Sequence, residues 1–318
     1  MKIPLTKYLK LARISAWPAF SLAFVIPFAV GADVRTSWPE ALVGFSAMFL
    51  FAAFAFALNF YADRDTDKYH DGIQKDFNLR QQPMVTGEVT TRECIVFCVV
   101  TLGAAIALGF VVSNLFGVLV ILNCLAGGLL YSHPWIRLKA KPAGDVVAIS
   151  LLGALAPSAG YVLGEGGRPT IMMMLFWFLV TATGYISTVM SDYEFDVKAK
   201  LKTSAVYFGQ TRLLQAMAVG CVLCAVLASF IFRDDYYPSG TRYFSVFAAG
   251  SLVALTAAVW RSLDPPRMHV PIISSSRPWV FLSVGIVLPG IISLLFLTYS
   301  FLKILAPESV GWDPFLIF

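Results

Sequence analysis

Oxygen-bearing side chains gather at regular spacing in the first of two acidic clusters. Asn59, Asp63 and Asp67 are four residues apart. Because each step of four advances about 40° around an α-helix, all three are predicted on one helix face, with Asp65 pointing away. Such groups repel one another unless a cation lies among them, and Mg²⁺ takes oxygen ligands that substrate phosphates often complete. This cluster predicts a metal site for phosphate chemistry.

The second cluster repeats the spacing further along the chain. Asp192 and Asp196 share a predicted helix face, Lys200 follows one turn later, and Glu194 lies off that face. A single pair of this kind is typical of a solvated helix end. Two clusters at matched positions, each at the end of an apolar stretch, instead favour one functional site, because ionisable groups at membrane depth are costly.

A basic run separates the two acidic clusters. It begins at Tyr131 and contains Arg137, Lys139 and Lys141, with His133 predicted to have a loop role. Arg137 and Lys139 are predicted to neutralise phosphate oxygens that the metal leaves uncovered. The alternative is that these cations only anchor a cytoplasmic loop.

The composition determines which elements must position these groups. The 318 residues are 58% hydrophobic and 14% charged, whereas soluble domains average about 25% charged residues. A water-soluble protein is therefore excluded. An aromatic content of 14% and only five cysteines exclude disorder and a disulfide scaffold. We predict an integral, all-α membrane protein.

The apolar stretches predict the path through the membrane, since a helix needs about 20 apolar residues to cross it. They lie at about 16–33, 41–62, 94–112, 114–131, 145–164, 169–190, 213–232, 243–260 and 279–302. We expect one domain over 1–318, a bundle of nine transmembrane helices around a central cavity. It consists of two related four-helix halves, 16–131 and 145–260, plus the ninth helix.

The basic residues predict the orientation, because they concentrate on the cytoplasmic side. With a cytoplasmic N-terminus, that side holds 19 of the 24 Lys and Arg residues, and the C-terminus lies outside. The net charge of +5 is then a topology signal, with no case for nucleic acid. The predicted location is a multi-pass membrane protein, in the cell membrane if prokaryotic, with its site facing the cytoplasm.

The two clusters, the Tyr131–Lys139 run and the nine apolar stretches resemble the UbiA superfamily of intramembrane prenyltransferases. The resemblance implies a nine-helix bundle capped by two cytoplasmic loops. It also implies Mg²⁺-dependent transfer of a prenyl group from a prenyl diphosphate, with the four aspartates as catalytic residues. The implied metal and diphosphate positions are Asn59, Asp63, Asp67, Asp192 and Asp196, and the phosphate-facing positions are Arg80, Tyr131, Lys139 and Lys200.

The sequence departs from the family after its first motif. Members commonly have an Arg-Pro pair followed by a short run to a glycine, whereas this chain has Arg80-Gln-Gln-Pro83 and then Gly87. The continuation of the Tyr131 run favours a bulky lipophilic acceptor such as lycopene, or another terpenoid or quinone-type acceptor. The predicted partners are thus a prenyl diphosphate, this acceptor and membrane lipids, and no protein partner is inferred.

Two other functions remain open. A UbiA-type terpene cyclase ionises the same diphosphate but traps the carbocation within the same molecule. A secondary transporter is suggested by nine spans and a repeat, although transporters place polar groups near the bilayer midplane and the acids here lie at the cytoplasmic ends of the spans.

Overall fold

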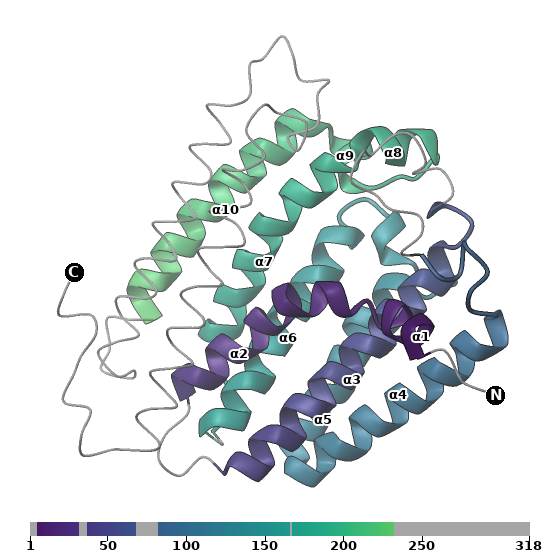
Figure 1. Ribbon diagram of the computed structural model, residues 1–318. Coiled ribbons are helices and arrows are strands. Elements are labelled where there is room, and N and C mark those ends of the chain that lie inside the picture. Colours follow the sequence, from purple (N-terminus) through teal and green to yellow (C-terminus); the bar gives the residue numbers. More distant parts are fainter. Residues whose placement is uncertain (1–4, 32–36, 68–81, 166, 232–318) are drawn as a thin grey trace.

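The computed structural model describes residues 5–31, 37–67, 82–165 and 167–231, and its regular elements there are all helical, with no strand in these ranges (Figure 1). The elements are α1 (Leu5–Leu11), η1 (Ile14–Ala16), α2 (Trp17–Gly31), α3 (Trp38–Asp63), α4 (Thr91–Val112), α5 (Asn114–Asn123), the π-helical η4 (Cys124–Leu130), η5 (Leu138–Ala140), α6 (Gly144–Glu165), α7 (Ile171–Ser191), α8 (Tyr193–Lys198), α9 (Ser204–Phe208) and α10 (Gln210–Ile231).

Seven of the nine predicted spans correspond to helices: α2, α3, α4, α5 with η4, α6, α7 and α10. By length and composition, the membrane-crossing candidates among the described residues are α3, α4, α6 and α7, and α5 with η4 forms a shorter apolar helix. The predicted all-helical class is confirmed for these ranges. The stretches 243–260 and 279–302 lie outside the described residues, so the total of nine spans stays a prediction.

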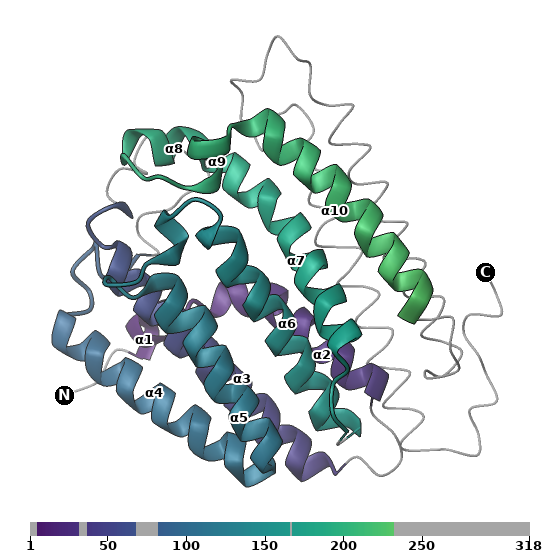
Figure 2. The same cartoon turned by 180° about the vertical axis from the view of Figure 1, so that it is seen from behind.

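Neighbouring helices in the bundle pack closely side by side. α3 packs against α4, α2 against α6, and α7 lies between α6 and α10 (Figures 1 and 2). The core between them is rich in aromatic side chains, including the fully buried Phe51 and Phe116. Gly128 of η4 lies so close to the ring of Phe54 on α3 that a Cβ would not fit. Small residues of this kind let membrane helices approach one another.

The N-terminal helix α1 forms ion pairs with the first turn of α4 and with the segment before it. Lys7 Nζ lies 2.5 Å from Glu93 Oε1, and Lys10 Nζ lies 2.8 Å from Glu88 Oε1. Glu93 also completes a capping box with Thr90, which starts α4 by satisfying backbone N–H groups of its first turn. Arg64, the residue after α3, donates from Nη1 to Thr91 Oγ1 at 3.1 Å, so the start of α4 lies beside the C-terminal end of α3.

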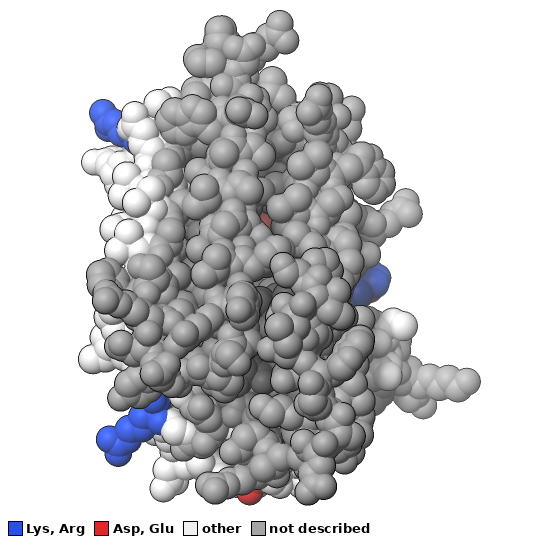
Figure 3. Space-filling model, turned by 90° about the vertical axis from the view of Figure 1, so that its left-hand side faces the viewer, with Lys and Arg blue, Asp and Glu red and all other residues white. Residues whose placement is uncertain are grey.

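Polar and apolar surfaces are separated along the bundle. On the face in Figure 3, the described residues along one margin are uncharged over a long stretch, with Lys or Arg only near its two ends. Many apolar side chains on α4 are exposed, among them Val99, Val100 and Val111. An apolar surface exposed along a helix long enough to cross a membrane is typical of contact with lipid.

Candidate active site

The first motif lies at the end of α3 and only partly on it. Asn59 and Asp63 belong to the helix, but α3 ends at Asp63, so the prediction that Asp67 continues the same helical face is wrong. The chain turns because Thr66 N–H donates to the carbonyl of Asp63 at 2.9 Å and Thr66 Oγ1 donates to the same oxygen at 3.1 Å. Asp65 points away as predicted, and its carboxylate pairs with Arg64.

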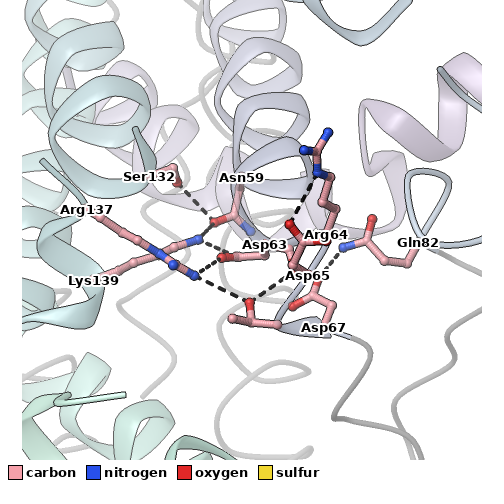
Figure 4. A network of polar contacts seen from close by, with 10 residues as sticks. Asn59, Asp63, Arg64, Asp65, Asp67, Gln82, Ser132, Arg137 and Lys139 are labelled. Carbon is pink, nitrogen blue, oxygen red and sulfur yellow. Dashed lines mark hydrogen bonds and ion pairs between the residues drawn. The ribbon is translucent and has the colours of Figure 1, made fainter. Parts of the chain in front are cut away.

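Two cations of the basic run hold the Asp63 carboxylate (Figure 4). Arg137 Nη2 lies 3.1 Å from Asp63 Oδ1, and Lys139 Nζ binds Oδ2 of the same carboxylate. Lys139 Nζ also donates to Asn59 Oδ1 at 2.6 Å, and Ser132 Oγ donates to that oxygen at 3.0 Å. Burial lowers the pKa of Lys139, while the charge of Asp63 opposes this shift. A segment some 75 residues away in sequence therefore reaches the first motif.

Asp67 forms a hydrogen bond with Gln82, which belongs to the segment before α4 (Figure 4). Gln82 Nε2 donates to Asp67 Oδ2, and the Gln82 side chain is buried. Burial, followed by the negative charge of Asp63, raises the pKa of Asp67 to about 7. Gln82 stands directly before Pro83, where the family commonly has arginine; this departure marked the position but did not predict its contact with Asp67. Arg80 lies outside the described residues.

The second motif lies between α7 and α9. Asp192 joins α7 to α8, and the N–H of Asp196 donates to the carbonyl of Asp192 at 2.9 Å, so the two share one helical turn as predicted. Asp196 is buried and accepts from Thr203 Oγ1 at 2.7 Å. Burial is the main cause that raises its pKa to about 7, with smaller contributions from Asp192, Asp145 and Asp63. Because the charge of Asp63 contributes to this pKa shift, the two motifs lie close enough for their charges to interact.

Lys200 does not extend the face of Asp192 and Asp196, so that prediction is wrong. α8 ends at Lys198, and Lys200 is exposed with a left-handed φ of 56°. The chain reverses here because Leu201 N–H donates to the carbonyl of Asp196 at 2.9 Å. This turn directs the chain towards α9 instead of continuing the helix.

Tyr131 links the basic run to α7. Its hydroxyl lies 2.8 Å from the hydroxyl of Tyr185, and Lys139 Nζ lies 5.6 Å from the centroid of its ring. Tyr131 thus borders the cation that binds Asp63. The sequence placed Tyr131 near the phosphate-facing cations, but nothing in it identified Tyr185 as its partner.

Arg13 is a further cation beside the first motif, and it is one of the 19 basic residues on the predicted cytoplasmic side. Its guanidinium lies 5.6 Å from the ring centroid of Phe56 and 5.8 Å from that of Phe60, both on α3. Its positive charge lowers the pKa of Asp67, although burial and Asp63 outweigh this effect. Its position immediately before the first apolar stretch was the available signal.

The oxygen donors of the first motif suit a hard divalent cation shared with a substrate. Asn59, Asp63 and Asp67 all offer carbonyl or carboxylate oxygens. Within the described ranges, however, no three or more His, Cys, Asp or Glu side chains group closely enough to hold one ion by themselves. Mg²⁺ characteristically takes one or two protein carboxylates and completes its shell with water and phosphate oxygens. The residues present fit that mode of binding.

Comparisons with known proteins agree with this arrangement. A family profile described as the UbiA prenyltransferase family matches residues 17–269. A solved UbiA homologue from Archaeoglobus fulgidus, bound to DMAPP and Mg²⁺, has a TM-score of 0.83 and 32% sequence identity, covering 94% of this chain and 99% of that one.

Two curated relatives match at lower identity. Digeranylgeranylglyceryl phosphate synthase of Methanopyrus kandleri is 25% identical over 64% of this chain and 70% of its own. Lycopene elongase/hydratase of Haloarcula japonica is 26% identical over 72% of this chain and 76% of its own. The resemblance seen in the motifs is thereby confirmed, and this integral membrane chain belongs to the UbiA prenyltransferase family.

Proposed function

We propose that this protein transfers a prenyl group from a prenyl diphosphate to a lipophilic acceptor, and that the diphosphate binds with Mg²⁺ between the two aspartate motifs. The observation that carries the proposal is the convergence of Asp63, Lys139 and Arg137 at the end of α3, within electrostatic reach of Asp196. Acidic and basic groups held together at one end of an apolar bundle can bind a cation and a polyanion side by side. DMAPP and Mg²⁺ in the Archaeoglobus fulgidus homologue support this choice of ligands.

Each part of the site has a separate task in this proposal. Asn59 and the aspartates Asp63, Asp67, Asp192 and Asp196 supply the oxygen ligands for the cation. When bound, Mg²⁺ supplies positive charge that stabilises the departing diphosphate as the allylic C–O bond breaks. Arg137, Lys139 and Tyr131 contact the phosphate oxygens in this proposal. Arg80 and Lys200 keep the phosphate-binding role that the family resemblance implies for them.

Lys139 and Arg137 are preorganised for binding phosphate, because Asp63 fixes the positions of both side chains. Both side chains are mostly shielded from solvent, with exposures of 11% and 26%. Cations fixed in a partly dry site stabilise developing negative charge without having to reorganise during the reaction. The apolar bundle beneath keeps water from the carbocation until the acceptor reacts.

The acceptor is proposed to be a bulky, lipophilic molecule that enters from the membrane. By their names, one of the two curated relatives makes digeranylgeranylglyceryl phosphate and the other elongates lycopene. We retain the carotenoid as the first acceptor to test, with a singly prenylated glyceryl phosphate as the second. The same proposal includes nine spans around a central cavity, one domain made of related halves, a cytoplasmic N-terminus and an active site that faces the cytoplasm.

The test is an assay of detergent-solubilised protein with dimethylallyl, geranyl and geranylgeranyl diphosphate, in Mg²⁺ or EDTA, with and without each acceptor. Diphosphate release and lipid products are measured together, the latter by mass spectrometry. Asp63→Asn removes an anionic ligand and is expected to abolish turnover. Asp65→Asn is the matched control, because Asp65 is two residues away, 75% exposed and turned from the motif.

A prenylated acceptor that requires Mg²⁺ and Asp63 but not Asp65 is the expected result. If a cyclic hydrocarbon forms without any acceptor, the protein is a terpene cyclase and not a prenyltransferase. Equal turnover in Asp63→Asn and Asp65→Asn would contradict the assignment of the first motif.

A further inference from the structure

A buried carboxylate outside both aspartate motifs joins the segments that carry them. Asp145 lies in the first turn of α6 and is only 1% exposed. Its Oδ2 accepts from the backbone N–H of Ser204 at 2.8 Å, and its Oδ1 accepts from the Ser204 hydroxyl. Oδ1 also accepts from the N–H of Val146 at 2.8 Å. Two of its three hydrogen bonds therefore lead to a residue 59 positions away, which capping of α6 alone does not require.

The same serine also holds the backbone just before α6. Ser204 Oγ accepts from the N–H of Ala143 at 2.8 Å. Ala143 has a left-handed φ of 60°, a conformation that is strained for a residue with a Cβ atom. Such strain persists only where the surroundings determine it. Ser204 thus fixes both the carboxylate of Asp145 and the turn that precedes it.

The two ends of this contact lead directly to the two motifs. Ser204 follows Thr203, whose hydroxyl donates to Asp196 at 2.7 Å. On the other side, the turn at Ala143 follows η5, which carries Lys139 and therefore the cation bound to Asp63. A continuous set of bonded groups runs from one motif to the other.

We propose that Asp145 is a positioning residue that fixes the spacing between the two motifs, so that both can hold one metal–diphosphate complex. This inference rests on the proposed function. Burying a carboxylate is costly unless hydrogen bonds offset the cost, and here the three donors come from Val146 of α6 and from Ser204 at the start of α9. Groups that orient metal ligands typically change metal affinity or activity by about 10–100-fold when mutated.

The test measures Mn²⁺ binding by electron paramagnetic resonance, in the presence of an unreactive prenyl thiolodiphosphate, so that turnover is not needed. Asp145→Asn keeps the shape of the side chain but turns one acceptor into a donor. Ser204→Ala is the milder variant, because it removes the hydroxyl and keeps the backbone N–H. Both are expected to weaken Mn²⁺ binding by about 10–100-fold, and the double variant is expected to bind no more weakly than Asp145→Asn.

Ser158→Ala is the matched control for a purely structural effect. Ser158 is also fully buried on α6, and its hydroxyl donates to the carbonyl of Ala154 within the same helix at 2.7 Å. Its loss is expected to lower thermal stability and to leave Mn²⁺ binding unchanged. Asp63→Asn is the reference for the proposed function and is expected to weaken Mn²⁺ binding.

The outcomes separate the two claims. If Asp63→Asn weakens Mn²⁺ binding while Asp145→Asn and Ser204→Ala bind as the wild type does, the positioning role is overturned and the proposed function stands. If Ser158→Ala weakens binding as much as Ser204→Ala, the effect is general destabilisation and the positioning role is again overturned. If Asp63→Asn binds Mn²⁺ as the wild type does, the proposed metal site itself fails.

Discussion

Replacing Lys139 by methionine shows whether its ammonium group serves the diphosphate or only neutralises Asp63. Lys139 Nζ donates to Asn59 Oδ1 at 2.6 Å and also binds Asp63 Oδ2. A hydrogen bond to a charged group contributes about 1.5–3 kcal/mol, and about 1.4 kcal/mol corresponds to a factor of ten in rate. Loss of one such bond to the diphosphate in the transition state is therefore expected to lower kcat/KM by about 10- to 150-fold.

The fold is expected to survive this change. Asp63 keeps Arg137 at 3.1 Å, so the cost stays below the roughly 3–5 kcal/mol that follows when a buried charge loses its only partner. The assay is steady-state diphosphate release, with thermal unfolding measured on the same samples. Lys141→Met is the matched control, because Lys141 is an exposed cation two residues further along the same loop.

A general attraction of the basic loop for phosphate would make the two methionine variants equally slow. Unchanged kcat/KM in Lys139→Met would show that the Lys139 ammonium does not serve the diphosphate and only pairs with Asp63.

Three further predictions follow from the same structure. The pKa of Asp196, raised from 3.8 to about 7, predicts that a pH–rate profile falls as the pH drops through about 7, because the protonated carboxyl binds a cation poorly. As the folded-state pKa exceeds the unfolded one, ionisation of Asp196 lowers stability as the pH rises from about 4 to 7, which thermal unfolding would show. Gly160→Ala presses a methyl group against a backbone carbonyl of α2 and is expected to cost about 1–3 kcal/mol, whereas Gly103→Ala, in the middle of α4, meets nothing within 4 Å and is expected to raise stability by about 0.5–1 kcal/mol. The proposed orientation predicts that a membrane-impermeant maleimide labels Ile171→Cys in intact cells but labels Trp135→Cys only after permeabilisation, both positions being exposed.

The helices were predictable because membrane spans obey a length rule that a single stretch of sequence reveals. The ends of the helices were harder, because local turn chemistry decides them. Thr66 binds the last carbonyl of α3 and turns the chain before Asp67, and the chain reverses at Lys200 instead of continuing α8. The predictions for Asp67 and Lys200 were both wrong because they continued the helical spacing past the end of the helix.

The site was predictable in its residue types and only partly in its contacts. Four-residue spacing and the neighbouring cations indicated which groups belong together, and Lys139 does reach Asp63. The contacts between Gln82 and Asp67, and between Asp145 and Ser204, join distant segments and leave no periodic pattern in the sequence. The one signal for Asp145 was its charge at the start of an apolar stretch, where an ionisable group is costly.

In the proposed function both aspartate motifs hold the same diphosphate. Isothermal titration calorimetry of an unreactive prenyl thiolodiphosphate in Mg²⁺, with Asp63→Asn, Asp196→Asn and the double variant, tests whether they do. Mutations at sites that share a partner are not additive, whereas independent sites add. If both motifs bind one diphosphate, each single variant weakens binding and the double variant loses less than the sum of the two free-energy changes. Full additivity, or an Asp196→Asn variant that binds as the wild type does, would contradict it.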